Sequence, residues 1–172
     1  MFRIPCCAFS VLLAITSSAV AGDVKLTAAQ GRDGSKSQQW QMKSIGNNQY
    51  NLVNVGVTQG TGGPNVLDYK EGAVAYLEEQ RGPEGNEAQR WLVEPIGDDL
   101  YLIKNVRRTR EVGISMVLDY KNADTLYLEQ QRDKNGNEAQ RWRRRTAGNG
   151  VYVFENIRLS REKKTPLVLT AK

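Results

Sequence analysis

The sequence predicts an all-β fold built from three copies of one unit, and two observations support this prediction. The hexapeptide NEAQRW occurs at residues 86–91 and again, 51 positions later, at residues 137–142. The longer segments that end in these hexapeptides, 66–91 and 117–142, share seventeen of twenty-six positions without a gap. Chance does not explain identity over this length, so the chain contains a duplicated unit with a period of 51 residues.

A third copy of the unit is divided between the two ends of the chain. Moving back 51 positions from the first hexapeptide reaches SQQW, in which Gln38 and Trp40 match the Gln and Trp of both hexapeptides. Moving forward 51 positions from Asp119 reaches Thr170 in the terminal LVLTAK. The end copies of an open array act as caps and are not halves of each other, so a unit shared between the termini predicts a closed ring of three.

Each copy contains four short runs of β-type composition. In copy two, which starts at Val66, they are VLDY, AYLEEQ, RWLVEPI and LYLIKNV, with Gly, Asn, Asp and Pro between them. Apolar and polar residues largely alternate along these runs, as in half-buried strands, and no run is convincingly helical. Three copies then give twelve strands. Three blades are too few to close a propeller, so we predict a β-trefoil with pseudo-threefold symmetry, a six-stranded barrel capped by three hairpins.

The tryptophans that end the repeated segments are the predicted centre of this fold. Trp40, Trp91 and Trp142 stand at equal spacing, one in each copy. A threefold barrel needs the same large apolar side chain from every copy, and burial of one indole contributes on the order of several kcal/mol. We therefore expect all three rings in the core, each with a partner for its ring N–H.

The first 21 residues have the pattern of a secretory signal peptide. Arg3 precedes an apolar run at residues 6–15, and Ala-Val-Ala then forms a cleavage site before Gly22. The apolar run is shorter than the roughly 20 residues that a membrane-spanning helix needs. We expect a mature domain of residues 22–172 that does not span a membrane and is secreted, or periplasmic in a Gram-negative bacterium. Its oligomeric state is not predicted.

Composition excludes several classes of catalytic and metal site. The chain has no His, and both cysteines lie in the signal segment, so His-dependent triads, thiol nucleophiles and zinc or blue-copper sites are excluded. Carboxylates are plentiful, but no spacing places two of them across a cleft. We therefore predict a protein that is not an enzyme and that has no cofactor and no metal.

A Gln-x-Trp triplet in each copy, preceded in two copies by Leu-Asp twenty-one residues upstream, resembles the ricin-type (R-type) lectin family of β-trefoils. The resemblance covers the whole mature chain. It implies a secreted carbohydrate-binding protein that has up to two shallow sites and whose partners are glycans or glycoproteins. In that family the Asp accepts hydrogen bonds from sugar hydroxyls, the Gln steadies the Asp, an aromatic ring stacks on the sugar, and an Asn holds another hydroxyl. The implied site residues are Asp68, Tyr76, Asn86 and Gln89 in copy two, and Asp119, Tyr127, Asn137 and Gln140 in copy three.

Three departures from the family pattern bear on these sites. The position directly before the triplet holds Ala88 or Ala139, so the Asn two residues earlier is the only substitute for the family's Asn. Strand alternation also allows the ring position to fall on a carboxylate, Glu78 or Glu129. The copy shared between the chain ends has Thr170 in place of the Asp, which predicts an inactive site.

Two other functions remain open from the sequence. Asp68 and Asp119 also fit carboxylates that only cap local backbone N–H groups. The missing Asn and the open ring position favour a trefoil that is a scaffold for protein contact, such as a protease inhibitor or a toxin-associated or host-interacting subunit. The basic runs at 141–145 and 161–164 indicate the other alternative, binding of an anionic polysaccharide. Aromatic residues do not interleave with these runs, so nucleic acid is not an expected partner.

Arg144 interrupts an apolar position of the repeat. The equivalent residues are Met42 in the composite copy and Val93 in copy two, both of which the strand pattern points inward. The sequence leaves two explanations: a bulge that turns the Arg outward, or a place near one end of the barrel where the charged head leaves the core.

Overall fold

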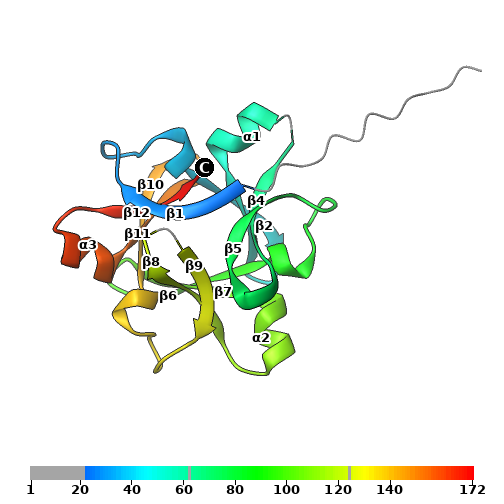
Figure 1. Ribbon diagram of the computed structural model, residues 1–172. Coiled ribbons are helices and arrows are strands. Elements are labelled where there is room, and N and C mark those ends of the chain that lie inside the picture. The colour runs from blue at the N-terminus through cyan, green and yellow to red at the C-terminus, as the bar shows by residue number, and fades with distance from the viewer. Residues whose placement is uncertain (1–21, 62, 124) are drawn as a thin grey trace, which may run out of the picture.

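Twelve strands make up the body of the computed structural model, which describes residues 22–61, 63–123 and 125–172 (Figure 1). The predicted signal peptide, residues 1–21, lies outside the described residues. The strands are β1 (Gly22–Ala28), β2 (Trp40–Gly46), β3 (Gln49–Asn54), β4 (Asn65–Tyr69), β5 (Ala75–Glu79), β6 (Trp91–Gly97), β7 (Leu100–Asn105), β8 (Met116–Asn122), β9 (Thr125–Gln130), β10 (Trp142–Gly148), β11 (Val151–Asn156) and β12 (Leu167–Ala171).

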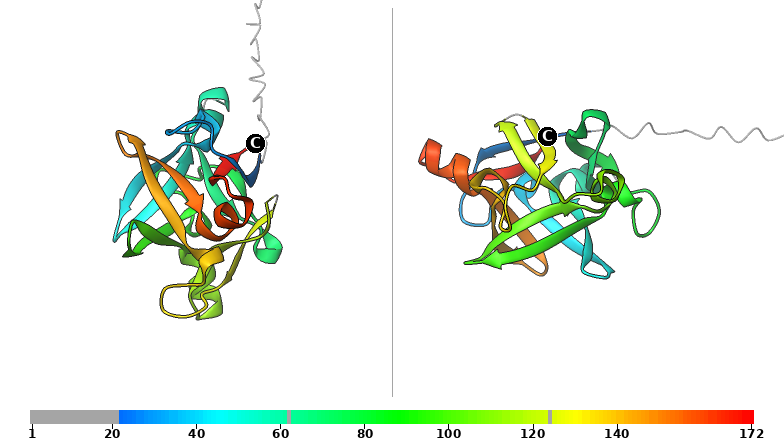
Figure 2. Two further views of the ribbon diagram at one scale, coloured as in Figure 1. Left: turned by 90° about the vertical axis from the view of Figure 1, so that its left-hand side faces the viewer. Right: turned by 90° about the horizontal axis from the view of Figure 1, so that it is seen from below.

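Six of these strands close into a barrel. Each strand pairs antiparallel with the next in the order β2, β3, β6, β7, β10 and β11, and β11 pairs with β2 to close the ring. The other six form the hairpins β4–β5, β8–β9 and β1–β12, each attached to the barrel at one end. Figure 2 shows the barrel strands extending away from these cap hairpins. A six-stranded barrel with three cap hairpins is the β-trefoil that the sequence predicts.

The two ends of the described chain complete one cap hairpin. Strands β1 and β12 pair antiparallel over five residues, from Val24 opposite Ala171 to Ala28 opposite Leu167. The two strands lie side by side in Figures 1 and 2, in blue and red. The composite copy therefore has the same hairpin that the other copies build from β4–β5 and β8–β9, which confirms the closed ring of three.

The three tryptophans are the first residues of β2, β6 and β10 and are fully buried. Each ring N–H donates to a main-chain oxygen in a different cap hairpin, and these oxygens also repeat at a spacing of 51. The bonds are Trp40 to Leu169 at 2.9 Å, Trp91 to Leu67 at 2.8 Å and Trp142 to Leu118 at 3.1 Å. Each indole thus fills the core and ties the barrel to one hairpin.

The expectation that the chain lacks helices is wrong. A two-turn helix follows the second barrel strand of each copy, at the periphery of Figure 1: α1 (Val55–Thr61), α2 (Val106–Val112) and α3 (Ile157–Lys163). Seven residues are too few to display a 3.6-residue period, so the apolar pattern did not reveal them. Single-turn 3₁₀ helices also occur: η1 (Lys36–Gln38), η2 (Glu71–Ala73), η3 (Glu87–Gln89) and η4 (Glu138–Gln140).

A buried asparagine begins each of the three α-helices. Asn54, Asn105 and Asn156 stand 51 residues apart, and the side-chain oxygen of each accepts the N–H of the third residue onward at 2.9–3.1 Å. This repeated cap was visible in the sequence as one Asn at the same position of each copy. None of the helices in the described part of the chain has the length and apolarity to cross a membrane.

Arg144 lies at the barrel end opposite the cap hairpins. It pairs with Phe154 in regular register, and the register shift of β10 comes later, between Thr146 and Gly148. The other two barrel hairpins shift at the equivalent place, between Ser44 and Gly46 in β2 and between Pro95 and Gly97 in β6. Arg144 is therefore not bulged outward, and of the two explanations only the barrel end fits.

Candidate functional site

The repeated hexapeptide forms a structural frame around one buried glutamine. In copy two the Gln89 side chain donates to the main-chain oxygen of Glu79 at 2.9 Å. Its oxygen accepts the backbone N–H groups of Arg81 at 2.9 Å and Asn86 at 3.3 Å, and the Asn86 side chain accepts the N–H of Gln89 in return. These reciprocal bonds fix η3 against the end of β5.

The same glutamine frame recurs in the other copies. Gln140 bonds to Gln130, Arg132 and Asn137 at 2.9–3.3 Å, and Gln38 makes equivalent bonds in the composite copy. The glycine that enters the turn has a positive φ, and at Gly136 a Cβ would lie 2.7 Å from a Leu102 methyl. The structural role of this frame is therefore enough to explain why the chain repeats NEAQRW.

Two buried aspartates lie next to this frame. Asp68 in β4 is 1% exposed and Asp119 in β8 is 2% exposed. Each accepts the N–H of the following tyrosine, at 2.6 Å in copy two and 2.7 Å in copy three, and the frame glutamine lies near enough to lower its pKa. Burial raises the pKa of both carboxyls above 3.8, against the lowering effect of these bonds. A carboxylate has about four lone-pair positions, so each keeps acceptor capacity for a ligand.

A tyrosine stands directly across the hairpin from each aspartate. Tyr76 pairs with Asp68, and Tyr127 pairs with Asp119. Directly opposed residues project to the same face of a ladder, so ring and carboxylate are neighbours. The tyrosine is the residue directly opposite the aspartate, and Glu78 and Glu129, two positions along the same strands, project to the same face.

Copy three has an open cavity at this place, with a volume of about 540 Å³. Its walls include Asp119, Tyr127 and Asn137, three of the four residues predicted for this site, together with Leu159 of α3. The oxygen of Asn137 caps η4, and its side-chain NH₂ group has no partner among the described residues. An acceptor, an aromatic ring and a free donor thus line one concavity, while Gln140 lies behind them in the frame.

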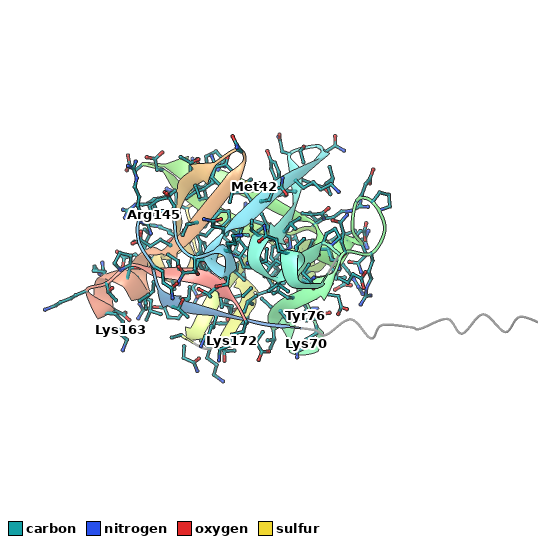
Figure 3. All side chains as sticks on the ribbon, turned by 90° about the horizontal axis from the view of Figure 1, so that it is seen from above. Met42, Lys70, Tyr76, Arg145, Lys163 and Lys172 are labelled. Atoms are coloured by element: carbon teal, nitrogen blue, oxygen red, sulfur yellow. The ribbon has the colours of Figure 1, made fainter. Side chains whose placement is uncertain are left out.

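Copy two has a smaller cavity, of about 340 Å³, in the equivalent region. It is lined by Tyr69, Lys70 and residues of α2, and none of the four residues predicted for this site is among its lining residues. Lys70 places its Nζ 5.6 Å from the centroid of the Tyr76 ring, and Figure 3 shows the two residues together. Copy two therefore has the predicted residues without an open space beside them.

One residue of the helix distinguishes the two cavities. Leu159 of α3 corresponds to Arg108 of α2, which lies 3.7 Å from Glu111. Glu111 also pairs with Arg107 at 2.6 Å and accepts the Tyr69 hydroxyl at 3.1 Å. The longer, charged Arg108 and this network occupy room that the shorter Leu159 leaves open. Sequence reasoning did not connect either residue with the site, because the helices were not predicted.

The composite copy lacks both the carboxylate and the ring. Thr170 stands at the aspartate position and shares a 2.7 Å hydrogen bond with the Thr27 hydroxyl. The Gln38 side chain, which would steady an aspartate, donates to Thr27 at 2.8 Å. Lys25 occupies the place of the tyrosine in the repeat. The residues of this copy agree with the expectation of an inactive site, which stays a prediction.

Basic side chains from separate parts of the sequence surround the copy three cavity. Lys121, Arg132, Arg158 and Lys163 line it, against the two carboxylates of Asp119 and Glu162. Three of the seven basic side chains in the runs at 141–145 and 161–164 have a carboxylate neighbour. Arg143 and Arg145 both lie 3.7 Å from Glu155, and Arg161 pairs with Glu138. Within the described residues, no group of three or more Asp, Glu, His or Cys is placed to hold a metal ion.

Comparison with known protein families gives a match over most of the chain. The model of a ricin-type beta-trefoil lectin domain-like family matches residues 36–125 and, in a second overlapping match, residues 88–162. A search of curated proteins found no significant match. The matched segments contain the Gln-x-Trp triplets of all three copies and both Asp–Tyr pairs. The chain therefore belongs to the ricin-type β-trefoil lectin-like family, a family of carbohydrate-binding, non-catalytic domains.

Proposed function

We propose that the protein binds a glycan through one principal site, formed by Asp119, Tyr127 and Asn137 in copy three. The observation that supports this proposal is that the three side chains line one open cavity of about 540 Å³. Membership of a lectin-like family supports the ligand class. The corresponding residues of copy two do not line the smaller cavity there, so we propose that its site is closed or much weaker.

Each side chain has a distinct role in this proposal. The buried Asp119 carboxylate accepts hydrogen bonds from neighbouring sugar hydroxyls, and charge-assisted bonds of this kind are the stronger ones. The Tyr127 ring covers the C–H face of the sugar without demanding polar partners. The free NH₂ group of Asn137 donates to a further hydroxyl, and Gln140 holds both Asp119 and η4 in position. A single shallow site of this kind has an affinity on the order of millimolar.

The basic rim favours glycans that carry carboxylate or sulfate groups. Four cations and two carboxylates line the cavity, which leaves a local excess of positive charge. Such a field speeds association with anionic ligands and is screened by salt. The anionic polysaccharide that the sequence left as an alternative is then a ligand of the same site. Binding should keep its dependence on Asp119 but weaken as the salt concentration rises.

A matched pair of variants tests the principal site. Asp119→Asn should reduce glycan binding by about 10- to 150-fold, which corresponds to the 1.5–3 kcal/mol of a hydrogen bond to a charged group. Asp68→Asn, the same change in copy two, should leave binding within about twofold. Glycan arrays followed by calorimetry on the best ligand measure both, and thermal melts verify folding. Equal losses in the two variants, or none in either, would contradict the proposal.

Export to the cell exterior is part of the proposal, because the signal-like segment 1–21 predicts it. N-terminal sequencing of the protein recovered from the culture medium or periplasm should begin at Gly22. Retention of the full-length chain in the cytoplasm would contradict this part and leave the glycan site unaffected.

One observation favours the second candidate, protein contact. Val112 and Ile114, at the end of α2, are 41% and 40% exposed, and both are apolar. Apolar loop tips are what a trefoil scaffold for protein contact would present. Changing both residues to Ser should leave glycan binding unchanged. If the double variant instead loses capture of a defined protein partner that Asp119→Asn retains, protein contact is the better description.

A further inference from the structure

The open end of the barrel contains a second cavity, of about 520 Å³, far from the glycan site. Arg144, Val93 and Tyr101 are among the residues that line it. They belong to the barrel strands, and the cap hairpins that hold the two Asp–Tyr pairs cover the other end. In Figure 3, Met42, which Arg144 contacts, lies on the side of the molecule opposite Tyr76.

The guanidinium of Arg144 lies between two aromatic rings in this end of the barrel. Its central carbon is 4.2 Å from the ring centroid of Tyr101 and 4.6 Å from that of Tyr152. Nη2 donates to the Tyr101 hydroxyl at 2.8 Å, and Nη1 approaches the Met42 sulfur at 3.6 Å. Tyr101 and Tyr152 are repeats of Tyr50, which lines the same cavity, so two equivalent tyrosines of the repeat contact the cation.

Arg144 has no carboxylate partner among the described residues. Its neighbours in sequence, Arg143 and Arg145, both approach Glu155, and elsewhere in the barrel Lys104 pairs with Glu94. The aromatic rings offset part of the hydration that this half-buried cation loses, but no counter-charge offsets the rest. The guanidinium has five N–H donors in a planar fork, of which its contacts with the Tyr101 hydroxyl and the Met42 sulfur use two. The remaining donors suit the two oxygens of a carboxylate.

The rest of the cavity has an apolar wall beside polar groups, among them Asn48. Tyr50, Leu92, Val93 and Pro95 line it beside Tyr101, and the one carboxylate among the lining residues, Glu94, is neutralised by its pair with Lys104. Binding sites for small molecules typically have volumes of 300–1,000 Å³ and combine apolar walls with a few polar groups that fix orientation. The composition of this cavity calls for an apolar ligand that carries one negative charge.

We propose that the open barrel end binds a small apolar carboxylate, such as an aromatic or short-chain acid, free or as the C-terminal residue of a peptide. The carboxylate binds the free N–H groups of Arg144, and the apolar body packs on Leu92, Pro95 and Tyr50. This site is independent of the proposed glycan site in position and in ligand chemistry.

Benzoate and its neutral analogue benzamide test the charge requirement. Benzoate should bind saturably, and benzamide should bind at least about tenfold more weakly, which corresponds to about 1.4 kcal/mol. Titrations followed by NMR should shift signals of residues at the barrel end and leave those of the cap hairpins unchanged. Equal binding of benzoate and benzamide would overturn the proposal. So would failure of both benzoate and the peptide acid acetyl-Ala-Phe to bind.

The repeat supplies a substitution that the barrel already accepts. Arg144→Met introduces the residue of the composite copy, so the variant should fold and should lose benzoate binding by about tenfold or more. Arg143→Met removes the same charge from the exposed side of the same strand and is the control, with benzoate binding unchanged. If Arg144→Met retains full benzoate binding while its melt is intact, Arg144 is only a structural cation and the proposal fails.

A second probe distinguishes the two sources of carboxylate. Acetyl-Ala-Phe should compete with benzoate if the site takes peptide C-termini, and the same peptide with an amidated end should not. If benzoate binds and acetyl-Ala-Phe does not compete with it, the site takes free acids. If neither acid binds, the proposal is overturned. Asp119→Asn should leave both acids bound, so failure of the glycan site and failure of this site are separate results.

Discussion

Copies two and three contain nearly the same residues around their aspartates, yet only copy three has an open cavity beside them. Asp, Tyr, Asn and Gln occur at identical positions of the repeat, the aspartates are equally buried, and the glutamine frames have matching bonds. The cavities differ in volume, about 340 Å³ against 540 Å³, and in whether the predicted site residues line them. The Asp, Tyr, Asn and Gln residues of the repeat therefore do not by themselves determine whether a copy has an open cavity.

The difference comes from the helix that follows each barrel hairpin. In copy two, Arg108 and the Glu111 network fill the region, and Lys70 covers the Tyr76 ring. In copy three, Leu159 stands at the position of Arg108, and the ion pair of Arg158 with Glu162 remains. The neighbour of the site, rather than the site itself, sets how much room a ligand has.

The largest effect expected concerns the frame that the two copies share. Gln89→Ala and Gln140→Ala each remove the partner of three hydrogen bonds, which at about 1–3 kcal/mol per buried group should lower the free energy of unfolding by about 3 kcal/mol or more. The losses should be equal in the two copies, as measured by urea unfolding. Gln131→Ala removes two exposed hydrogen bonds and one part-buried bond from the Ser115 hydroxyl, and should cost clearly less than either frame variant. Unequal losses at Gln89 and Gln140 would mean that the frames differ after all.

Exchange of one helix residue should transfer the open cavity between copies. Leu159→Arg should weaken glycan binding by about tenfold or more, because the new side chain occupies the space beside Tyr127. Arg108→Leu should open copy two and raise the stoichiometry in calorimetry from one site to two. The double exchange should restore a single site, now dependent on Asp68 and not on Asp119. Unchanged stoichiometry in Arg108→Leu would show that Lys70 or another residue closes copy two.

The tyrosine rings should contribute unequally for the same reason. Tyr127→Ala should reduce affinity by about tenfold, since a stacking face is lost, while Tyr127→Phe keeps the ring and most of the affinity. Tyr76→Ala should have little effect on binding measured by the same titration. An equal reduction from Tyr76→Ala would argue that both copies bind ligand.

The smallest effect is a pH dependence with opposite signs for stability and binding. Burial raises the pKa of Asp68 and Asp119, so their protonation favours the folded state. This contribution to stability is complete below pH 3.8, the usual pKa, and is lost as the pH rises through the raised pKa. Glycan binding needs the ionised Asp119 and should weaken as the pH falls through that same pKa. Affinity titrations and denaturant melts across this range measure the two trends, and in Asp119→Asn the copy three part of both should disappear.

Repetition made the fold predictable in detail, whereas single departures from repetition were harder to interpret. The 51-residue period and the divided copy predicted the closed ring, and the tryptophan triplet predicted the core. The α-helices were missed because two turns show no period, although the Asn triplet that caps them was present in the sequence. Arg144 stood out as an exception, but only the regular register with Phe154 chose between the two explanations.

What the sequence by itself determined is the threefold β architecture and the identity of the residues beside each aspartate, since both follow from positions that repeat. Only the tertiary structure decided which copy has space for a ligand. Arg108 and Leu159 lie 40 residues from their aspartates in sequence, and their effect depends on how a helix packs over a hairpin. A period in sequence fixes which positions are equivalent, but the volume left beside them is set by side chains that the fold brings from elsewhere.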